Sequence, residues 1–186
     1  MVIKDAVYVY RLVGGDKLAW HGRYHTHGQG DYEFHFFTEG QGAFLLNRSR
    51  YRIEGNRLFL TRPREFHSIL PEAVEKPISY YAILFEPGGV DAEALALMNG
   101  AGPAGNRVIS IEARERFLVE ELYHLVRSGS PQNGRAAEYL ILSMMHRWYG
   151  RHPAAEEPAA PKAERNEHVE RALALTEKSV REKIGT

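Results

Sequence analysis

Short apolar or alternating runs, separated by turn residues, extend from Ala6 to Glu86. Runs such as AVYVYRLV, YEFHFFT, RLFLT and SYYAILFE have the length of strands, and Gly, Asn or Pro lies between them. Period-two alternation places successive side chains on opposite faces of a strand, and no helical period fits this region. Many short strands at close spacing are typical of an all-β sandwich or barrel. We predict a mainly β fold, an antiparallel β-barrel, over residues 1–105.

The pattern of apolar and polar residues changes at Pro87-Gly88-Gly89. Residues 90–98 predict a short helix, and the segment NGAGPAGN, residues 99–106, has the composition of a loop. Residues 106–150 then carry two amphipathic patterns, which predict helices from about Glu112 to Arg127 and from about Arg135 to Tyr149.

The loop between these helices is Ser128-Gly129-Ser130-Pro131, in which a glycine and a following proline end the first helix. A short connection favours antiparallel packing of the pair. The apolar stripe of the first helix is Leu118, Leu122 and Leu125, and that of the second is Ala137, Leu140, Ile141, Met144 and Trp148. Such a pair either covers a barrel or forms a dimer interface, and the pattern alone leaves both open.

Proline and alanine dominate residues 151–165, which predicts a semi-extended linker. Residues 166–186 predict one further helix that begins at Asn166. One amphipathic helix cannot bury its apolar stripe alone. We therefore expect this helix to be the first element of a second domain that is cut short.

The charge and the amino-acid composition exclude several classes of protein. The 186 residues carry 24 Lys and Arg against 24 Asp and Glu, so that there is no net charge and no basic stripe for nucleic acid. The absence of cysteine excludes disulfides and thiolate metal sites, and fits a reducing cytoplasm. No apolar run is long enough for a membrane-spanning helix. We expect a cytoplasmic chain with no membrane contact.

The strongest chemical signal is the His25-Thr26-His27 segment, followed by Glu33 and later by His67. Two histidines at alternate positions of a strand point to the same face. Imidazole and carboxylate groups are good ligands for zinc, nickel, iron or manganese. We predict that His25, His27, Glu33 and His67 hold one divalent transition metal ion; the alternative is a metal-free pocket that hydrogen-bonds an organic ligand.

Two further residues share the strand face of Glu33. His35 would either replace Glu33 as the fourth metal ligand or line the pocket beside it, and Phe37 follows on the same face. We therefore predict that His35 and Phe37 bind the ligand, whereas Phe34 and Phe36 occupy the opposite face.

The spacing of these residues resembles the two sequence motifs of the cupins. His25, His27 and Glu33 match the first motif, with Gly40 seven positions after Glu33. The second motif is matched by Gly55, Pro63 and His67. The gap between His27 and Glu33 is five residues, GQGDY, which is longer than usual, and Ala19 stands where the motif has glycine. The resemblance implies a cupin-type barrel with a metal or ligand site inside.

The order of elements, a barrel followed by two helices, a proline-rich linker and a new helix, resembles the AraC-type transcription regulators. This resemblance implies that the barrel senses a small-molecule effector such as a sugar and that the helix pair forms a homodimer. It also implies DNA binding through a C-terminal domain with two helix-turn-helix units, which is missing here apart from residues 166–186. We expect no enzymatic activity and no DNA binding by this chain itself.

An alternative function is that of a free-standing metal-dependent cupin enzyme. Such an enzyme would use the same His25, His27, Glu33 and His67, with an open coordination position for its substrate. The proline-rich segment leading into an incomplete domain argues against this alternative, because an enzyme of this size has no need of it.

Overall fold

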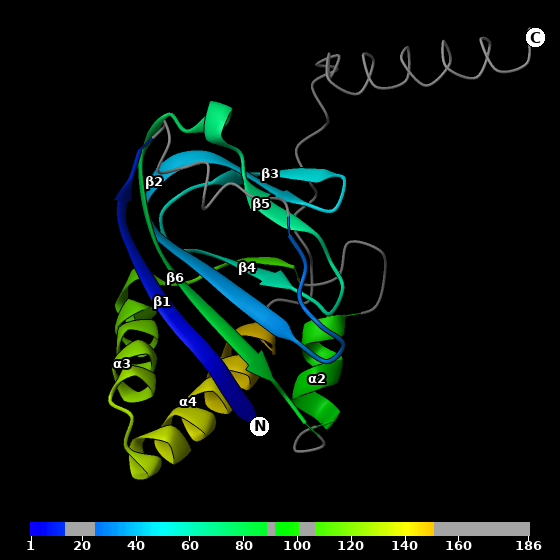
Figure 1. Cartoon of the computed structure of the whole chain (residues 1–186), viewed down its shortest axis with the longest axis vertical. Coiled ribbons are helices and arrows are strands. Elements are labelled where there is room, and N and C mark those ends of the chain that lie inside the picture. Colours follow the sequence, from blue (N-terminus) through cyan, green and yellow to red (C-terminus); the bar gives the residue numbers. More distant parts are fainter. Residues whose placement is uncertain (14–24, 89–91, 101–106, 151–186) are drawn as a thin grey trace, which may run out of the picture.

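The computed structural model describes residues 1–13, 25–88, 92–100 and 107–150 (Figure 1). The strands are β1 Val2–Leu12, β2 Tyr32–Leu46, β3 Ser49–Ile53, β4 Arg57–Thr61, β5 His67–Ile69, β6 Lys76–Glu86 and β7 Val108–Ser110. The helices are α2 Ala92–Asn99, α3 Arg116–Arg127 and α4 Pro131–Tyr149, with 3-10 turns η1 Pro71–Ala73 and η2 Ala113–Glu115.

The long strand β2 organises the sheet because its two halves pair with different neighbours. Its first half, from Glu33 to Phe37, lies between β4 and β6. Its second half, from Gly42 to Leu46, pairs with β3 and β5. Every pairing between named strands is antiparallel, and the order β1-β6-β2-β4-β7 forms the main path. The prediction of a mainly β, antiparallel fold is confirmed.

The prediction of a closed barrel needs a correction. Among the described strands the pairing path ends at β1 and at β7 and does not return on itself. The register of β2 against β6 shifts between Phe37 and Gln41, so the strand bends and carries its second half into a separate layer with β3 and β5 (Figure 1). Two layers joined by one bent strand enclose the interior without a continuous ring of hydrogen bonds.

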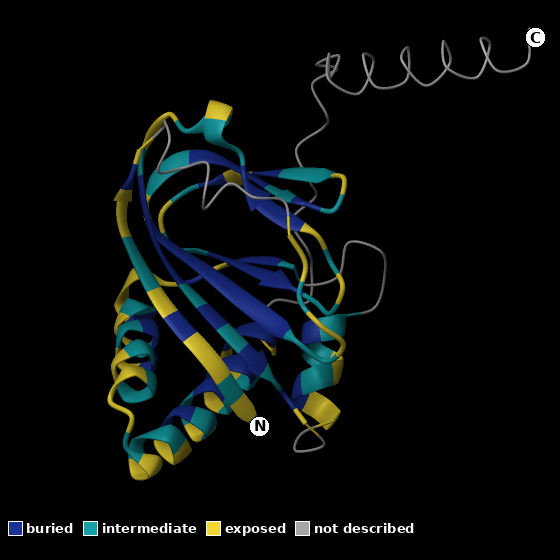
Figure 2. Ribbon diagram, viewed as in Figure 1, coloured by how far each residue is buried: buried dark blue, intermediate teal, exposed yellow. Residues whose placement is uncertain are grey.

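Side chains of β2 alternate between two apolar clusters, as predicted from its pattern. Phe34 and Phe36 face the helices and pack in one cluster with residues such as Trp148 of α4. Phe37 faces the space between the layers and packs with Phe44. The central part of the sheet is accordingly buried, whereas the outward sides of the helices are exposed (Figure 2). The helices therefore cover the outer face of the main sheet, and the inner face is left to form a site.

The helix boundaries differ from the predicted ones at their amino ends. The second helix begins at Pro131 rather than Arg135, because the Ser130 side chain accepts a hydrogen bond from the Asn133 backbone N and caps it. The first helix is preceded by the 3-10 turn η2 and begins at Arg116 rather than Glu112.

The apolar faces of the two helices are close to the predicted ones. Leu122 is buried as expected, but Val119 is the other buried residue of α3, while Leu118 and Leu125 are only partly buried. The face of α4 includes buried Ala137, Ile141, Met144 and Trp148, with Met145 and Tyr149 added. The predicted face is therefore rotated slightly at α3 and wider at α4.

Several predictions concern residues outside the described part of the chain. These are most of the loop 99–106, the linker 151–165 and the helix 166–186. The described helices include none with the length and apolarity needed to span a bilayer.

Candidate metal and ligand site

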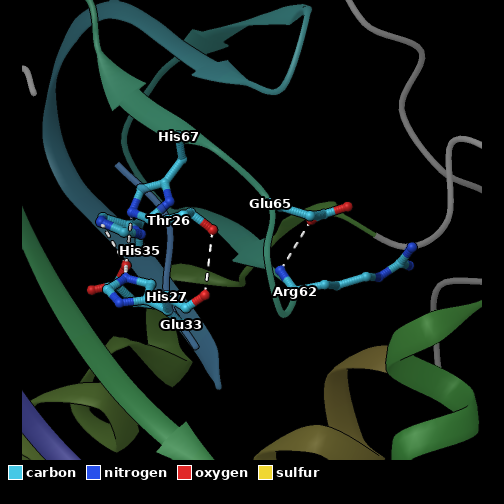
Figure 3. A network of polar contacts seen from close by, with 7 residues as sticks. All are labelled: Thr26, His27, Glu33, His35, Arg62, Glu65 and His67. Carbon is cyan, nitrogen blue, oxygen red and sulfur yellow. Dashed lines mark hydrogen bonds and ion pairs between the residues drawn. The ribbon is translucent and has the colours of Figure 1, made fainter. Parts of the chain in front are cut away.

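The four predicted metal ligands come from three neighbouring segments at the inner face of the sheet, and Figure 3 draws three of them, His27, Glu33 and His67. Glu33 is the second residue of β2 and His67 is the first residue of β5. His25 forms a two-way backbone bridge with His67, in which each N donates to the other's carbonyl oxygen at 3.2 and 3.0 Å. The bridge carries the His25-Thr26-His27 segment to His67, and the start of β2 supplies the carboxylate.

Glu33 lies at the centre of this cluster. Its Oε2 lies 2.8 Å from Nε2 of His27 and 2.9 Å from Nε2 of His67. Nε2 of His35 is further away, at 3.7 Å from the same oxygen. One ligand atom from each of His25, His27, Glu33 and His67 lies within 4.8 Å of the others. The structure thus brings together the four residues that the sequence singled out, with His35 beside them.

The cluster forms part of the wall of a cavity of about 240 Å³. His67, Glu33 and His35 are buried, whereas His25 is exposed and His27 is intermediate. The cavity is lined by Val7, His25, Glu33, His35, Phe44, His67, Ser68, Ile69, Tyr80 and Ala82. The wall therefore contains both polar and apolar groups, and one of its residues, His25, is exposed to solvent.

The site holds a carboxylate among neutral and partly charged imidazoles. Burial acts to raise the pKa of Glu33, but electrostatic interaction with the neighbouring imidazoles of His35 and His67 and the hydrogen bond from His27 hold that pKa well below its ordinary value. The hydrogen bond to Glu33 raises the pKa of His27 against a smaller effect of burial. Burial lowers the pKa of His35 to about 3, so His35 is neutral at physiological pH. Glu33 is therefore ionised and available as a ligand.

The donor set fits a divalent transition metal ion. Three imidazoles and one carboxylate match zinc, nickel, iron or manganese, and ligands at 2.0–2.2 Å from an ion lie about 3 to 4 Å from one another. The separations here, from 2.8 Å to at most 4.8 Å, need only a small adjustment. Both ring nitrogens of His67 and Nδ1 of His35 are buried and make no hydrogen bond of acceptable angle within the described chain. Such groups need a partner.

The two predicted ligand-binding residues occupy different surroundings. His35 lines the cavity. Phe37 is fully buried in the adjoining apolar cluster, with its ring centroid 5.9 Å from that of Phe44 and 5.3 Å from that of Tyr80, and it is not a lining residue. Phe37 therefore supports the wall from behind.

Sequence reasoning missed several residues of the wall. Tyr80 and Ala82 of β6 and Val7 of β1 line the cavity. Burial, and to a lesser extent the charge of Glu33, raise the pKa of the Tyr80 hydroxyl, which therefore stays protonated. The alternation of SYYAILFE showed that Tyr80 and Ala82 share a face, but nothing local showed that this face meets the histidines.

This fold and site together define a cupin-like ligand-binding domain. The model of the AraC-like ligand binding domain family matches residues 14–144, more than half of the chain. The chain belongs to that family. No curated protein matches the sequence.

Solved structures of similar fold include two regulators and one cupin. ToxT from Vibrio cholerae O395, bound to (E)-4-(8-methylnaphthalen-1-yl)but-3-enoic acid, has 10% identity and a TM-score of 0.48 over 81% of this chain and 59% of that one. The AraC-like transcriptional activator CuxR has 11% identity and a TM-score of 0.39 over 73% and 46%. A cupin protein from Bacteroides fragilis has 15% identity and a TM-score of 0.36 over 53% and 75%. The chain thus spans about half of each regulator.

Proposed function

We propose that this chain is the effector-sensing part of an AraC-type transcription regulator and that its effector site contains a divalent transition metal ion. The observation that carries the proposal is the convergence of His25, His27, Glu33 and His67 within 4.8 Å at the wall of a cavity. Membership of the AraC-like ligand-binding family supports the sensing role. The regulator would act in the cytoplasm, where its DNA lies.

Each side chain of the site has a distinct part in holding an effector. A metal ion bound here supplies a Lewis-acidic anchor for an oxygen atom of a small molecule. Among the described residues that line the cavity, Glu33 alone carries a formal negative charge, which would offset the charge of the ion. His35, neutral and buried, offers one donor and one acceptor, while Phe44 and Ile69 contribute apolar contact.

We propose a sugar as the effector class, because its hydroxyl oxygens suit both the metal ion and the polar groups of the wall. The cavity volume of about 240 Å³ suits a small compound.

Dimerisation and control of DNA are the other parts of the proposal. Helix α3 exposes Phe117 and helix α4 exposes Tyr139, which are 62% and 67% accessible to solvent. Exposed aromatic residues are typical of protein interfaces. The helix pair would join two copies of the chain, and the DNA would be bound by a C-terminal domain beyond it.

A metal-dependent cupin enzyme remains the second candidate, because the same four ligands beside an open cavity would equally serve catalysis. Metal-dependent turnover of an added compound would favour it. Stoichiometric binding without turnover would favour the sensor.

Metal titration of the purified chain tests the proposed site. We expect isothermal titration calorimetry with Zn²⁺ or Ni²⁺ to show one site per chain, and His67→Ala to weaken it. Loss of groups that merely orient a metal ligand reduces affinity about 10- to 100-fold, so loss of a ligand should cost at least as much. His124→Ala is the matched control, because His124 is an exposed histidine of α3. Unchanged affinity in His67→Ala, or no metal binding by the wild type, would contradict the proposal.

A further inference from the structure

The turn between β4 and β5, residues 62–66, connects the site to a distant part of the molecule. It follows Thr61 and leads directly into His67. Its end is held to Asn47, whose backbone N donates to the carbonyl oxygen of Phe66 at 2.6 Å and whose Oδ1 accepts from the Phe66 backbone N at 3.0 Å. Arg64 has a φ of 63°, an uncommon conformation for a residue with a side chain. The turn is short, pinned and strained.

Two side chains of this turn point away from the histidines and hold other elements (Figure 3). Nη2 of Arg62 donates to the carbonyl oxygens of Met98 at 2.9 Å and Asn99 at 2.7 Å, the last two residues of α2. Glu65 accepts from the Arg62 backbone N at 3.0 Å and pairs with Nη2 of Arg107 at 2.5 Å. The turn therefore connects His67 with the carboxyl end of α2.

The carboxyl end of α4 adjoins the same region. Met98 of α2 and Tyr149 of α4 are buried in one apolar cluster. The ring of Tyr149 stacks on Phe34, the neighbour of Glu33 in β2, at 6.2 Å between centroids. Burial raises the pKa of the Tyr149 hydroxyl, and the positive charge of Arg62 opposes this effect. The last turn of α4 thus contacts β2, which supplies Glu33, and lies near Arg62 of the turn that leads to His67.

Hydrogen bonding in this region is incomplete. The Tyr149 hydroxyl, Nε of Arg62 and Nε of Arg107 are buried and have no hydrogen-bond partner within the part of the chain described. Unsatisfied buried polar groups cost free energy, so a small displacement that gives them partners is favourable. Coupling between the site and α4 requires such a second arrangement, in which these groups gain partners.

His67 is the member of the cluster most directly able to drive such a displacement. Its Nε2 lies 2.9 Å from Glu33, and a ligand placed between the two groups must separate them. Because β5 has only three residues, movement of His67 passes into the turn before it. Arg62 then transfers the movement to the end of α2.

We infer that the turn of residues 62–66 couples occupancy of the cavity to the carboxyl end of α4, with Arg62 as the positioning residue. This inference rests on the proposed function for its purpose, because α4 leads to the segment in which the regulator's DNA-binding part would begin. The coupling requires that cavity occupancy favour one arrangement of α2 and α4 over another.

Hydrogen exchange of the full chain, followed by mass spectrometry with and without Zn²⁺, tests the coupling. We expect Zn²⁺ to change exchange in peptides covering the last turn of α4 at least threefold in the wild type. Arg62→Gln should bind Zn²⁺ as the wild type does but lose this change. Arg64→Gln is the matched control in the same turn, because Arg64 is exposed, and it should keep the change.

A second measurement needs no metal. His67→Gln, made alone and together with Arg62→Gln, forms a double-mutant cycle read at the same α4 peptides. We expect His67→Gln to alter exchange there only when Arg62 is present. Additive effects of the two substitutions would overturn the coupling, as would Zn²⁺ binding that leaves α4 unchanged. Absence of Zn²⁺ binding in calorimetry would instead overturn the proposed metal site, and the double-mutant cycle would still decide the coupling.

Discussion

A single carboxylate holds the site together at the scale of individual residues. Glu33 lies within 2.9 Å of two imidazole nitrogens, and it stays ionised although it is buried. A buried charge without partners would be unstable, so the histidines stabilise the carboxylate as much as it orients them. The site is in this sense preorganised before any ligand binds.

A second buried carboxylate, Glu115, has a structural part. It is 2% exposed, its Oε2 accepts a hydrogen bond from Nε1 of Trp148 at 3.1 Å, and its other oxygen pairs with Arg147. These bonds fix the turn η2 to the end of α4. Glu115 is the last residue of η2, directly before α3 begins at Arg116.

We predict that Glu115→Ala lowers the free energy of unfolding by about 2 kcal/mol, because a buried indole N–H loses a charged acceptor. Urea unfolding followed by circular dichroism measures this change. Glu112→Ala, which removes a solvent-exposed ion pair with Arg114, should change stability by less than about 0.5 kcal/mol. Equal losses in the two variants would show that the Glu115 bonds do not stabilise the fold.

At the scale of elements, the bend of β2 determines where the site lies. Gly40 has a φ of 104°, and a Cβ at this position would lie 2.5 Å from the carbonyl oxygen of Pro77 and 2.6 Å from Cα of Ile78. Only glycine permits this conformation and this close approach to β6 together. The bend carries the second half of β2 to β5, and β5 carries His67.

We predict that Gly40→Ala destabilises the protein by about 3 kcal/mol, from the strained φ and from the clash with backbone atoms. Gly129→Ala is a control for the conformation alone, because its φ is 67° but a Cβ there would meet nothing within 4 Å. That control should cost about 1 kcal/mol. Chemical unfolding compares the two variants, and similar losses would refute the role given to the close approach.

At the scale of the whole molecule, the helices separate two functions of one sheet. Helices α2, α3 and α4 cover one side of the main sheet, and the cavity lies on its other side (Figure 1). In the described part of the chain, the sides of α3 and α4 that face away from the sheet are exposed to solvent and could contact a partner (Figure 2). A signal between the two functions must pass through or around the sheet, and the turn of residues 62–66 offers a route around it.

We predict that Phe117→Glu converts a dimer of the full chain into a monomer, because a charge in an apolar interface is left without a partner. Size-exclusion chromatography with light scattering measures the mass. Val2→Glu, which places the same charge on an exposed position of β1, should leave the dimer intact. A wild-type chain that stays monomeric at high concentration would contradict the proposed homodimer.

Much of this fold follows from local sequence. Period-two alternation determined which residues of β2 share a face, and it correctly separated Phe34 and Phe36 from Glu33 and His35. Helical periodicity and the glycine and proline at residues 129 and 131 determined the helix pair, with each helix start displaced by four residues. These features depend only on near neighbours in the chain, so a linear pattern contains them.

Tertiary structure decided what the sequence pattern left open. It placed His67 beside His25. It also placed Tyr80 and Val7, rather than Phe37, in the cavity wall. The Glu115 side chain is buried against Trp148, which no local pattern indicated. Each outcome depends on the register and packing of segments that are far apart in the chain. A shift of one residue in such a pairing reverses every side chain of a strand, and no local pattern fixes it.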